Sequence, residues 1–355
     1  MKKNLYLLLC TALLIASCKE TPVTPSVTPK EFAFDTDQNS SLMFQDGESQ
    51  EVMTSAARRY NIAKLIRVTA VDEQHIEVAN FAPIDVENAT ILATITSSPA
   101  GSTPQVVKLF TITKIRAHAK QTIKYPFVDG TKLFLDTNNK EVDLSGYKEG
   151  IAPAIISFDF TGDNATIISL KKLAKLKWDI KYHDFDPNND PNNNWAADIT
   201  AKDIRRFSGL MINMGIVFVS DAFKTEFLKE RLLANDGTTV LTDVQKLKTY
   251  NDILNHPYFE CGKVEKVSGL GGGSTLGYAE HVIRDYISID ASYITAHEVG
   301  HCVGYGHSSN MTYPVTFNNV STGFSPLTGR IIQKFFNEKL FPVTLDNYYK
   351  PADFR

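Results

Sequence analysis

Residues 297–307 read His-Glu-Val-Gly-His-Cys-Val-Gly-Tyr-Gly-His, a stretch in which three histidines and one glutamate stand at fixed spacings. On a helix, residues four apart share a face, so the spacing predicts that His297 and His301 direct their imidazoles at one metal ion. Glu298 follows His297 directly, which brings its carboxylate within reach of a water on that metal. Gly304 adopts a positive φ at low cost, and we expect it to end the helix and return His307 as a third ligand.

This donor set predicts one catalytic Zn²⁺ ion. Three histidine ligands leave a fourth coordination position for water, whereas structural zinc sites are closed by four protein ligands. In that arrangement Glu298 is the general base, which takes a proton from the water and later passes it to the leaving amine. The alternative is a helix with core histidines, but three buried neutral imidazoles beside a carboxylate would then lack hydrogen-bond partners.

The extended pattern H-E-x-x-H-x-x-G-x-x-H resembles the active-site motif of the metzincin zinc peptidases. The resemblance implies a tight turn with a methionine beneath the metal, and Met311 is the methionine that follows the motif. Its Met-Thr-Tyr sequence is similar to the Met-x-Tyr of astacins and serralysins, which implies that Tyr313 reaches the metal or donates a hydrogen bond to the oxyanion. Matrixins have Met-Tyr-Pro instead. This chain has Thr312 between the methionine and the Tyr-Pro pair, so it combines features of both patterns.

The connection between the third histidine and the methionine departs from the family pattern. Only three residues lie between His307 and Met311, fewer than the resemblance leads us to expect. An ordinary core role for Met311 and a packing role for Tyr313 therefore stay open as alternatives.

The resemblance also implies an edge strand ahead of the active-site helix that pairs with extended substrate. The glycine-rich residues 271–277 stand in that place, and the predicted substrate rim consists of Gly273, Ser274, Thr275 and Leu276. A flexible surface hairpin is the alternative. We further expect a strand at residues 282–289 and Asp290 as the N-cap of the helix that carries the histidines.

The first residues are typical of an export signal. Lys2 and Lys3 precede an eleven-residue apolar run, too short to span a bilayer, and the run leads into Ala-Ser-Cys18. This resembles the lipobox of bacterial lipoproteins, which implies cleavage before Cys18 and lipidation of its thiol. We therefore expect a signal peptide at 1–17, a flexible tether at 18–30, and an exported lipoprotein anchored at the outer membrane or cell surface. A plain secretory signal is the alternative.

The net charge and the cysteines of the mature chain lead to two further expectations. Loss of residues 1–17 removes Lys2 and Lys3, so the formal net charge changes from −3 to −5, and the chain has no block of basic residues. We therefore expect no nucleic-acid partner. The resemblance to metzincins implies a protein or peptide substrate, and the oligomeric state stays open, with a monomer favoured. Cys261 and Cys302 remain in the mature chain and are the predicted disulfide, with two separate buried thiols as the alternative.

Two other segments carry weaker patterns. Residues 184–194 alternate Asp or Asn with other residues, as in the first half of a calcium loop. Asn189 replaces the EF-hand glycine and Trp195 the final glutamate, so a solvated loop is favoured over a Ca²⁺ site. Asp163 ends a Phe-Thr-Gly-Asp sequence that resembles the inhibitory pro-segment motif of astacins, and a turn after a strand explains it equally well.

The mature chain of 338 residues predicts two domains and an α+β fold. Residues 31–165 hold short β-prone runs separated by turn residues, typical of an all-β sandwich of immunoglobulin type. Residues 175–355 are the predicted metzincin-like catalytic domain. The clearest expected elements are strands at 65–71, 89–95, 106–112, 176–182 and 216–219, a helix at 201–213 capped by Thr200, and a final helix at 331–340.

From these residues we expect a lipid-anchored zinc endopeptidase that hydrolyses peptide bonds of extracellular proteins. One alternative is a cell-surface binding protein on an inactive peptidase fold, which Glu298 disfavours because binding needs no base. The other is a zinc hydrolase of non-peptide substrates.

Overall fold

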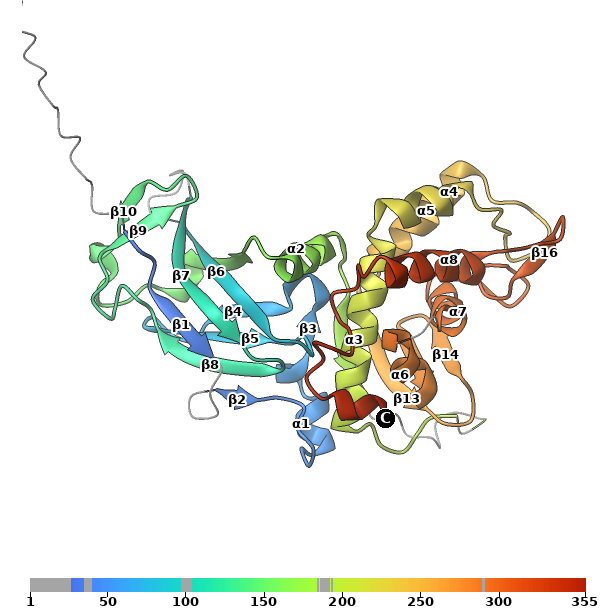
Figure 1. Ribbon diagram of the computed structural model, residues 1–355, viewed down its shortest axis with the longest axis horizontal. Coiled ribbons are helices and arrows are strands. Elements are labelled where there is room, and N and C mark those ends of the chain that lie inside the picture. Colours follow the sequence, from blue (N-terminus) through green and yellow to red (C-terminus); the bar gives the residue numbers. More distant parts are fainter. Residues whose placement is uncertain are drawn as a thin grey trace, which may run out of the picture.

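The structure is a computed structural model that describes residues 27–34, 40–96, 104–183, 185, 192, 194–288 and 291–355. The fold is mixed α+β, as expected, with a sheet-rich N-terminal half and a helix-rich C-terminal half on either side of a long central helix (Figure 1). The predicted signal peptide at 1–17, Cys18 and most of the tether at 18–30 lie outside the described residues.

The N-terminal half contains two sheets, and their buried residues belong to a hydrophobic core that continues into the C-terminal half. One has the strand order β10-β9-β7-β6-β11, with β1 parallel to β7, and the other has the order β2-β8-β5-β4. Buried residues alternate along β6, as expected for a half-buried strand. The strands are β1 (Glu31–Phe34), β2 (Ser41–Leu42), β4 (Ile66–Ala70), β5 (His75–Asn80), β6 (Val86–Ile95), β7 (Gln105–Ile115), β8 (Ala119–Lys124), β9 (Leu133–Asp136), β10 (Glu141–Asp143) and β11 (Ile156–Thr161). The predicted strands at 65–71, 89–95 and 106–112 are confirmed as β4, β6 and β7.

The C-terminal half is organised around a sheet of order β14-β15-β13-β12-β3. Its inner pairs, β12 with β13 and β13 with β15, are parallel, whereas β14 and β3 run antiparallel to their neighbours. Its strands are β3 (Tyr60–Asn61), β12 (Asp179–Tyr182), β13 (Tyr258–Val264), β14 (Gly269–Gly272) and β15 (Thr275–Ala279). Because β3 comes from the segment before β4, the N-terminal residues complete this sheet.

Helices and one hairpin make up the remainder. The central helix is α3, whose N-terminus carries the predicted Thr200 cap in a reciprocal box with Asp203. The final predicted helix is confirmed as α8, which begins earlier than expected. The helices are α1 (Gln50–Thr54), α2 (Ala165–Lys172), α3 (Ala201–Phe218), α4 (Asp221–Lys229), α5 (Asp243–Leu254), α6 (Glu280–Ser288), α7 (Ser292–Cys302) and α8 (Phe324–Asn337), and the hairpin is β16 (Val315–Phe317) with β17 (Val320–Thr322).

The predicted strand at 216–219 is wrong, because these residues finish α3 and cap its end. Because this helix is buried along almost its whole length, its last turn consists of consecutive apolar residues and shows no polar face. A short apolar run does not distinguish a buried strand from a buried helix.

The predicted strand at 282–289 is also wrong. Its described residues belong to α6, in which Val282, Ile283, Tyr286 and Ile287 are buried. Those four positions recur at helical spacing and form one stripe, while intervening residues are polar.

The two halves are held together by a buried arginine. Nε and Nη2 of Arg205, on α3, donate to the two carboxylate oxygens of Asp353 at 3.0 and 3.1 Å. Its Nη1 donates to the carbonyl oxygen of Phe44 at 2.8 Å and to the carboxylate of Asp46 at 3.0 Å. Arg205 thus joins the C-terminal residues to the segment between β2 and α1 of the N-terminal half.

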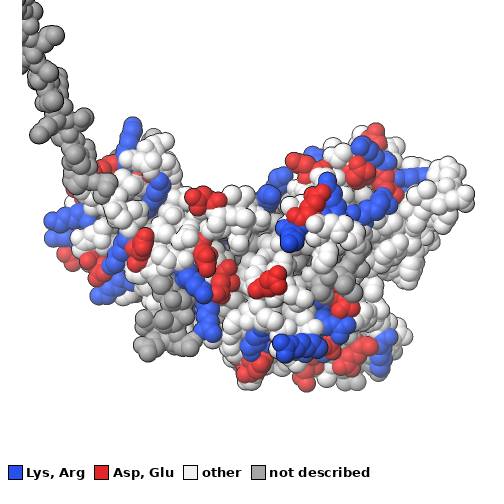
Figure 2. Space-filling view, viewed as in Figure 1, with Lys and Arg blue, Asp and Glu red and all other residues white. Residues whose placement is uncertain are grey.

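Surface charge is mixed on the visible face of the molecule. Among the described residues of the face drawn in Figure 2, lysine and arginine are interspersed with aspartate and glutamate. No single described helix is long and apolar enough to cross a membrane; α3 and α4 pass that test only as a pair, with a bend of 64° between them.

Candidate metal centre

Helix α7 presents two of the predicted ligands and the predicted base. His297, Glu298 and His301 all lie within its bounds, and the two histidines are one helical turn apart. Gly304 has a φ of +92°, and its N–H donates to the carbonyl oxygen of His301. The helix therefore ends as the sequence predicts, at a glycine that turns the chain back toward the site. Its N-cap residue is Ala291, without a side-chain cap bond, and Asp290 lies outside the described residues.

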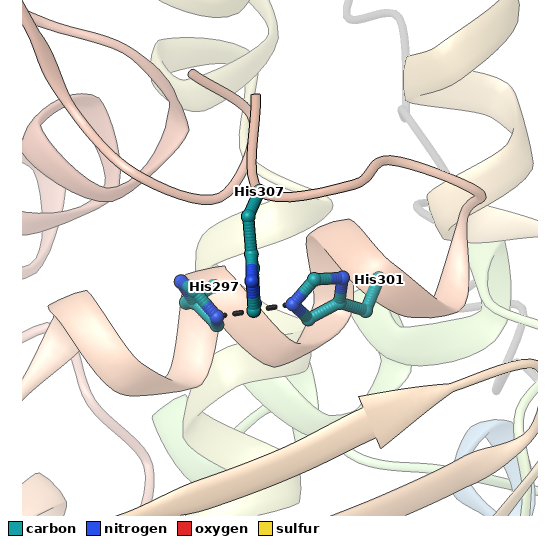
Figure 3. Close-up of side chains that lie close together, drawn as sticks. All are labelled: His297, His301 and His307. Carbon is teal, nitrogen blue, oxygen red and sulfur yellow. Dashed lines mark hydrogen bonds between the residues drawn. The ribbon is translucent and has the colours of Figure 1, made fainter. Parts of the chain in front are cut away.

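The three histidine rings converge on one point (Figure 3). One ring nitrogen from each of His297, His301 and His307 lies within 4.8 Å of the others, and the Nε2 atoms of His297 and His301 are 3.1 Å apart. Nitrogens about 2.0–2.1 Å from one tetrahedral ion would be roughly 3.3 Å apart, so this spacing fits shared coordination. No other group of three or more His, Cys, Asp or Glu ligands occurs in the part of the chain that the structure describes.

Backbone carbonyls orient the two helical histidines. Nδ1 of His301 lies 2.7 Å from the carbonyl oxygen of Tyr305, and since a carbonyl only accepts, Nδ1 is the protonated nitrogen. The ring of His297 hydrogen-bonds to the backbone of Thr312. Bonds of this kind fix the tautomer and leave Nε2 free as the ligand atom.

Burial keeps these imidazoles neutral, which is the form that binds a metal. Desolvation, reinforced by the neighbouring His301, lowers the pKa of His297 to about 4. Desolvation also lowers the pKa of His301. His307 is exposed, so the triad is open to solvent on that side.

Glu298 lies beside the triad but outside it. The carboxylate is 4.0 Å from Nε2 of His297, and the residue is only 5% exposed. Burial raises the pKa of Glu298 to about 7, and a hydrogen bond from the backbone of Gly271 acts in the opposite direction. The group can therefore both take up and release a proton near neutral pH.

Met311 lies in a buried turn that packs against α7. Its side chain is fully buried, and its carbonyl oxygen touches Gly300, the residue before His301. The hydroxyl of Thr312 donates within the turn, to the carbonyl oxygens of Gly306 and Ser309. These bonds close the short connection after the third histidine.

The same turn is tied to the segment that follows α4. Oγ of Ser309 donates to the carbonyl oxygen of Leu233, and the side-chain amide of Asn310 donates to the carbonyl of Arg231. The amide oxygen of Asn310 accepts from the N–H of Leu233. Sequence reasoning missed Ser309 and Asn310, because their partners are more than seventy residues away.

Tyr313 stands at the triad. Its ring centroid lies 4.6 Å from that of His297 and 5.0 Å from that of His307. The side chain is 53% exposed, so its ring is not part of the core. The structure therefore brings together all three predicted ligands, the predicted base and this tyrosine.

A cavity of about 640 Å³ opens over the triad between α7, β14 and the residues after Met311. Its apolar lining includes Val267, Leu270, Tyr293, Ile294 and Pro314. Within this lining Glu298 is the one acidic residue, and lysine and arginine are absent.

The predicted substrate rim is displaced by one strand. Gly273 and Ser274 form the turn of a hairpin, and Thr275 and Leu276 begin β15, which is an inner strand. None of these four lines the cavity; the sheet ends instead at β14, whose residues Gly269–Gly272 precede them. The glycine-rich pattern marks the hairpin correctly but does not say which of its strands is paired on both sides.

The predicted disulfide is wrong, because Cys261 and Cys302 are free, buried thiols. Sγ of Cys302 donates to the carbonyl oxygen of Thr275 at 3.4 Å. Thr275 lies on β15, which pairs with β13, the strand that holds Cys261. Helix α7 contacts the sheet through this hydrogen bond. Burial raises the pKa of Cys302 to about 12, so the thiol stays protonated.

Two weaker sequence patterns lie away from the triad. Most of the candidate calcium loop at 184–194 lies outside the described residues. Asp163 lies between β11 and α2, in the N-terminal half of the chain.

Comparison with known proteins finds no relative of this chain. No protein-family model, curated protein or solved structure matches the chain.

Proposed function

We propose that this chain is a zinc-dependent endopeptidase with a metzincin-like active site. The observation that carries the proposal is the convergence of His297, His301 and His307 beside the buried carboxylate of Glu298. A structural metal site needs a complete ligand set and no free base, whereas a hydrolytic site needs three ligands, an open position and a base. The residues present match the second description.

The donor chemistry fits Zn²⁺. Three neutral imidazole nitrogens suit zinc, and the backbone bonds to His297 and His301 hold the tautomer that coordination requires. When bound there, the ion would supply Lewis acidity toward a water and toward the substrate carbonyl.

Glu298 moves the proton. Its carboxylate accepts a proton from the attacking water and then donates it to the leaving amine nitrogen. Burial supports this role, because it raises the pKa of the carboxyl group and so lets it hold a proton more readily than an exposed glutamate does. Tyr313, whose ring lies against His297, would donate its phenol hydrogen to the oxyanion that develops on the carbonyl oxygen.

The edge of the sheet supports a peptide as the substrate. Strand β14 stands at the end of the sheet order and borders the cavity, so an extended peptide can hydrogen-bond to its outer edge. The apolar lining around Leu270 and Ile294 favours an apolar side chain beside the scissile bond.

The same proposal extends to the fold. A mixed sheet with an antiparallel edge strand beside the histidine helix supports a metzincin-like domain at 175–355. Two sheets around one core support an immunoglobulin-like sandwich at 31–165.

We also propose that the protein is a lipoprotein anchored through Cys18. The lipobox-like sequence supports this, and the Thr- and Pro-rich residues after it suit a tether. Cys18→Ser should release the protein from membranes in detergent partitioning. Unchanged partitioning of that variant would refute the anchor.

The proposed reaction is tested by presenting the zinc-loaded chain with proteins, peptides and small esters, each with and without a chelator. We expect chelator-sensitive cleavage of peptide bonds. Hydrolysis confined to the esters would favour a non-peptide hydrolase, and metal binding without any hydrolysis would favour a binding protein.

A further inference from the structure

Strand β14 crosses directly over Glu298. A Cβ added to Gly269 would lie 2.4 Å from Oε1 of Glu298, 2.7 Å from Cγ and 2.8 Å from Cδ. A Cβ added to Gly271 would lie 2.5 Å from the carbonyl oxygen of Glu298 and 2.9 Å from its Cα. Residues two apart on a strand share a face, so both glycines face α7.

Two other glycines of the same hairpin show why glycine is needed at positions 269 and 271. Gly272 and Gly273 have φ values of +155° and +56°, and nothing lies within 4 Å of a Cβ added to either. Their backbone conformation accounts for glycine there. Gly269 and Gly271 have no such positive φ, so the requirement for glycine at these two positions is the close approach to Glu298.

The two positions differ in which atoms would have to move to make room for an added side chain. At Gly271 the nearest atoms are helix backbone, so an added side chain would separate β14 from α7. At Gly269 the nearest atoms form the flexible end of Glu298 itself, which can rotate to another rotamer while the strand stays in place. A substitution at Gly269 therefore acts on the carboxylate rather than on the fold.

We propose that Gly269 is a positioning residue for Glu298, because it leaves empty the volume in which the carboxylate stands beside the histidine triad. The backbone of Gly271, on the same strand, hydrogen-bonds to the carboxylate. This inference rests on the proposed function of Glu298 as the base. It assigns to the glycine-rich strand a role beyond binding substrate.

The test compares Gly269→Ala and Gly271→Ala in the full mature chain loaded with zinc, with Gly146→Ala as the control, because nothing lies within 4 Å of a Cβ added to Gly146. We expect Gly269→Ala to keep its zinc and its melting temperature while kcat falls by about 10–100-fold and KM stays nearly constant, since displacement of a reacting group by about 1 Å can cost 10²-fold. Gly271→Ala should lower the melting temperature as well. The control should match the parent chain.

A second variant separates positioning from a general disturbance of the strand. Aspartate is one methylene shorter than glutamate. In a Glu298→Asp background the added methyl of Gly269→Ala should therefore make a milder steric clash with the carboxylate. The fold-loss caused by Gly269→Ala should therefore be smaller in that background than in the parent. Equal losses in both backgrounds, or a rise in KM without a fall in kcat, would overturn the proposal.

A crystal structure of Gly269→Ala gives a readout independent of activity. The expected result is a carboxylate of Glu298 rotated away from His297 with β14 unmoved. A strand displaced from α7 around an unmoved carboxylate would refute the positioning role. If the parent chain cleaves no peptide, the proposed function fails, and this structure still decides whether Gly269 positions Glu298.

Discussion

The carbonyl oxygen of Met311 lies against Gly300, so closely that a Cβ on Gly300 would stand 2.2 Å from it. Gly300 immediately precedes His301 on α7, and Thr312, which follows Met311, hydrogen-bonds through its backbone to the ring of His297. This contact therefore sets the distance between the helix that carries two histidines and the turn that orients one of them.

Gly300→Ala should consequently weaken both stability and metal binding. The added methyl meets backbone, which cannot rotate away, so we expect a loss of about 1–3 kcal/mol in the free energy of unfolding. Displacement of Thr312 should lower zinc affinity by about 10–100-fold, as for other changes to the groups that orient ligands. Gly146→Ala is the matched control, because nothing lies within 4 Å of its added Cβ. Zinc titration and thermal unfolding check both effects, and a Gly300→Ala chain with parental affinity would contradict this account of the turn.

Tyr313→Phe removes one hydroxyl while keeping a ring that is 53% exposed. If that hydroxyl stabilises the oxyanion, kcat should fall by about 10²–10³-fold with KM and zinc content nearly unchanged. Steady-state kinetics with a defined peptide measure this. A kcat within about twofold of the parent would assign the ring to packing against His297 and His307.

The buried His118 should make the fold sensitive to acid. It is 0% exposed, and burial, reinforced by the nearby Arg205 and Arg58, lowers its pKa from an ordinary 6.5 to about 3. Between these two values the unfolded chain binds a proton that the folded chain does not. Stability should therefore fall as the pH falls from about 6.5 toward 3, with His118 contributing up to about 1.4 kcal/mol per pH unit.

The variant His118→Asn isolates this contribution, because asparagine tolerates the positive φ of 47° at this position but does not titrate. Its unfolding free energy at neutral pH should be lower, since a buried ring is lost. Its slope against pH between 4 and 6 should be shallower than that of the parent by about one proton. Denaturant titrations at several pH values provide both numbers, and parallel slopes would rule His118 out as the group responsible.

Asp353→Ala should weaken the packing of the C-terminal residues on α3. The change removes the two-bond partner of the Arg205 guanidinium, which is 1% exposed and keeps Asp46 and the carbonyl of Phe44 as its remaining partners. We therefore expect a loss of about 1.5–3 kcal/mol in the free energy of unfolding, typical of hydrogen bonds to a charged group. Lys350→Ala removes an exposed ion pair with Asp46 and should cost less than about 1 kcal/mol. Equal effects of the two substitutions in chemical denaturation would show that the buried pair contributes no more to stability than the exposed one.

The sequence predicted those parts of the site that depend on local spacing. His297, Glu298 and His301 lie within one helical turn and the next, and Gly304 ends the helix by its own conformational freedom, so eleven consecutive residues contain the information. Thr200 was likewise predictable as a cap, because its partner Asp203 is three residues away. The β-prone runs before residue 165, together with the helical patterns after it, predicted the mixed α+β class.

The parts that escaped prediction depend on contacts between distant residues. Which strand of the glycine hairpin lies at the sheet edge is decided by the pairing of β15 with β13, and the sequence of the hairpin does not encode it. The close approach of Gly300 to Met311 and the bonds from Ser309 to Leu233 are equally non-local. Cys261 and Cys302 matched a plausible pair by compartment, but compartment says nothing about the geometry of two thiols.

The most direct test of the central claim is to incubate the zinc-loaded mature chain and its Glu298→Gln variant with a complex peptide mixture and to identify new N-termini by mass spectrometry. Both proteins should contain about one zinc per chain, because Glu298 is not among the ligands. The account predicts new termini from the parent chain, abolished by a chelator, and about 10²–10⁴-fold less cleavage by Glu298→Gln. Absence of cleavage by the zinc-loaded parent, or equal cleavage by the variant, would contradict it.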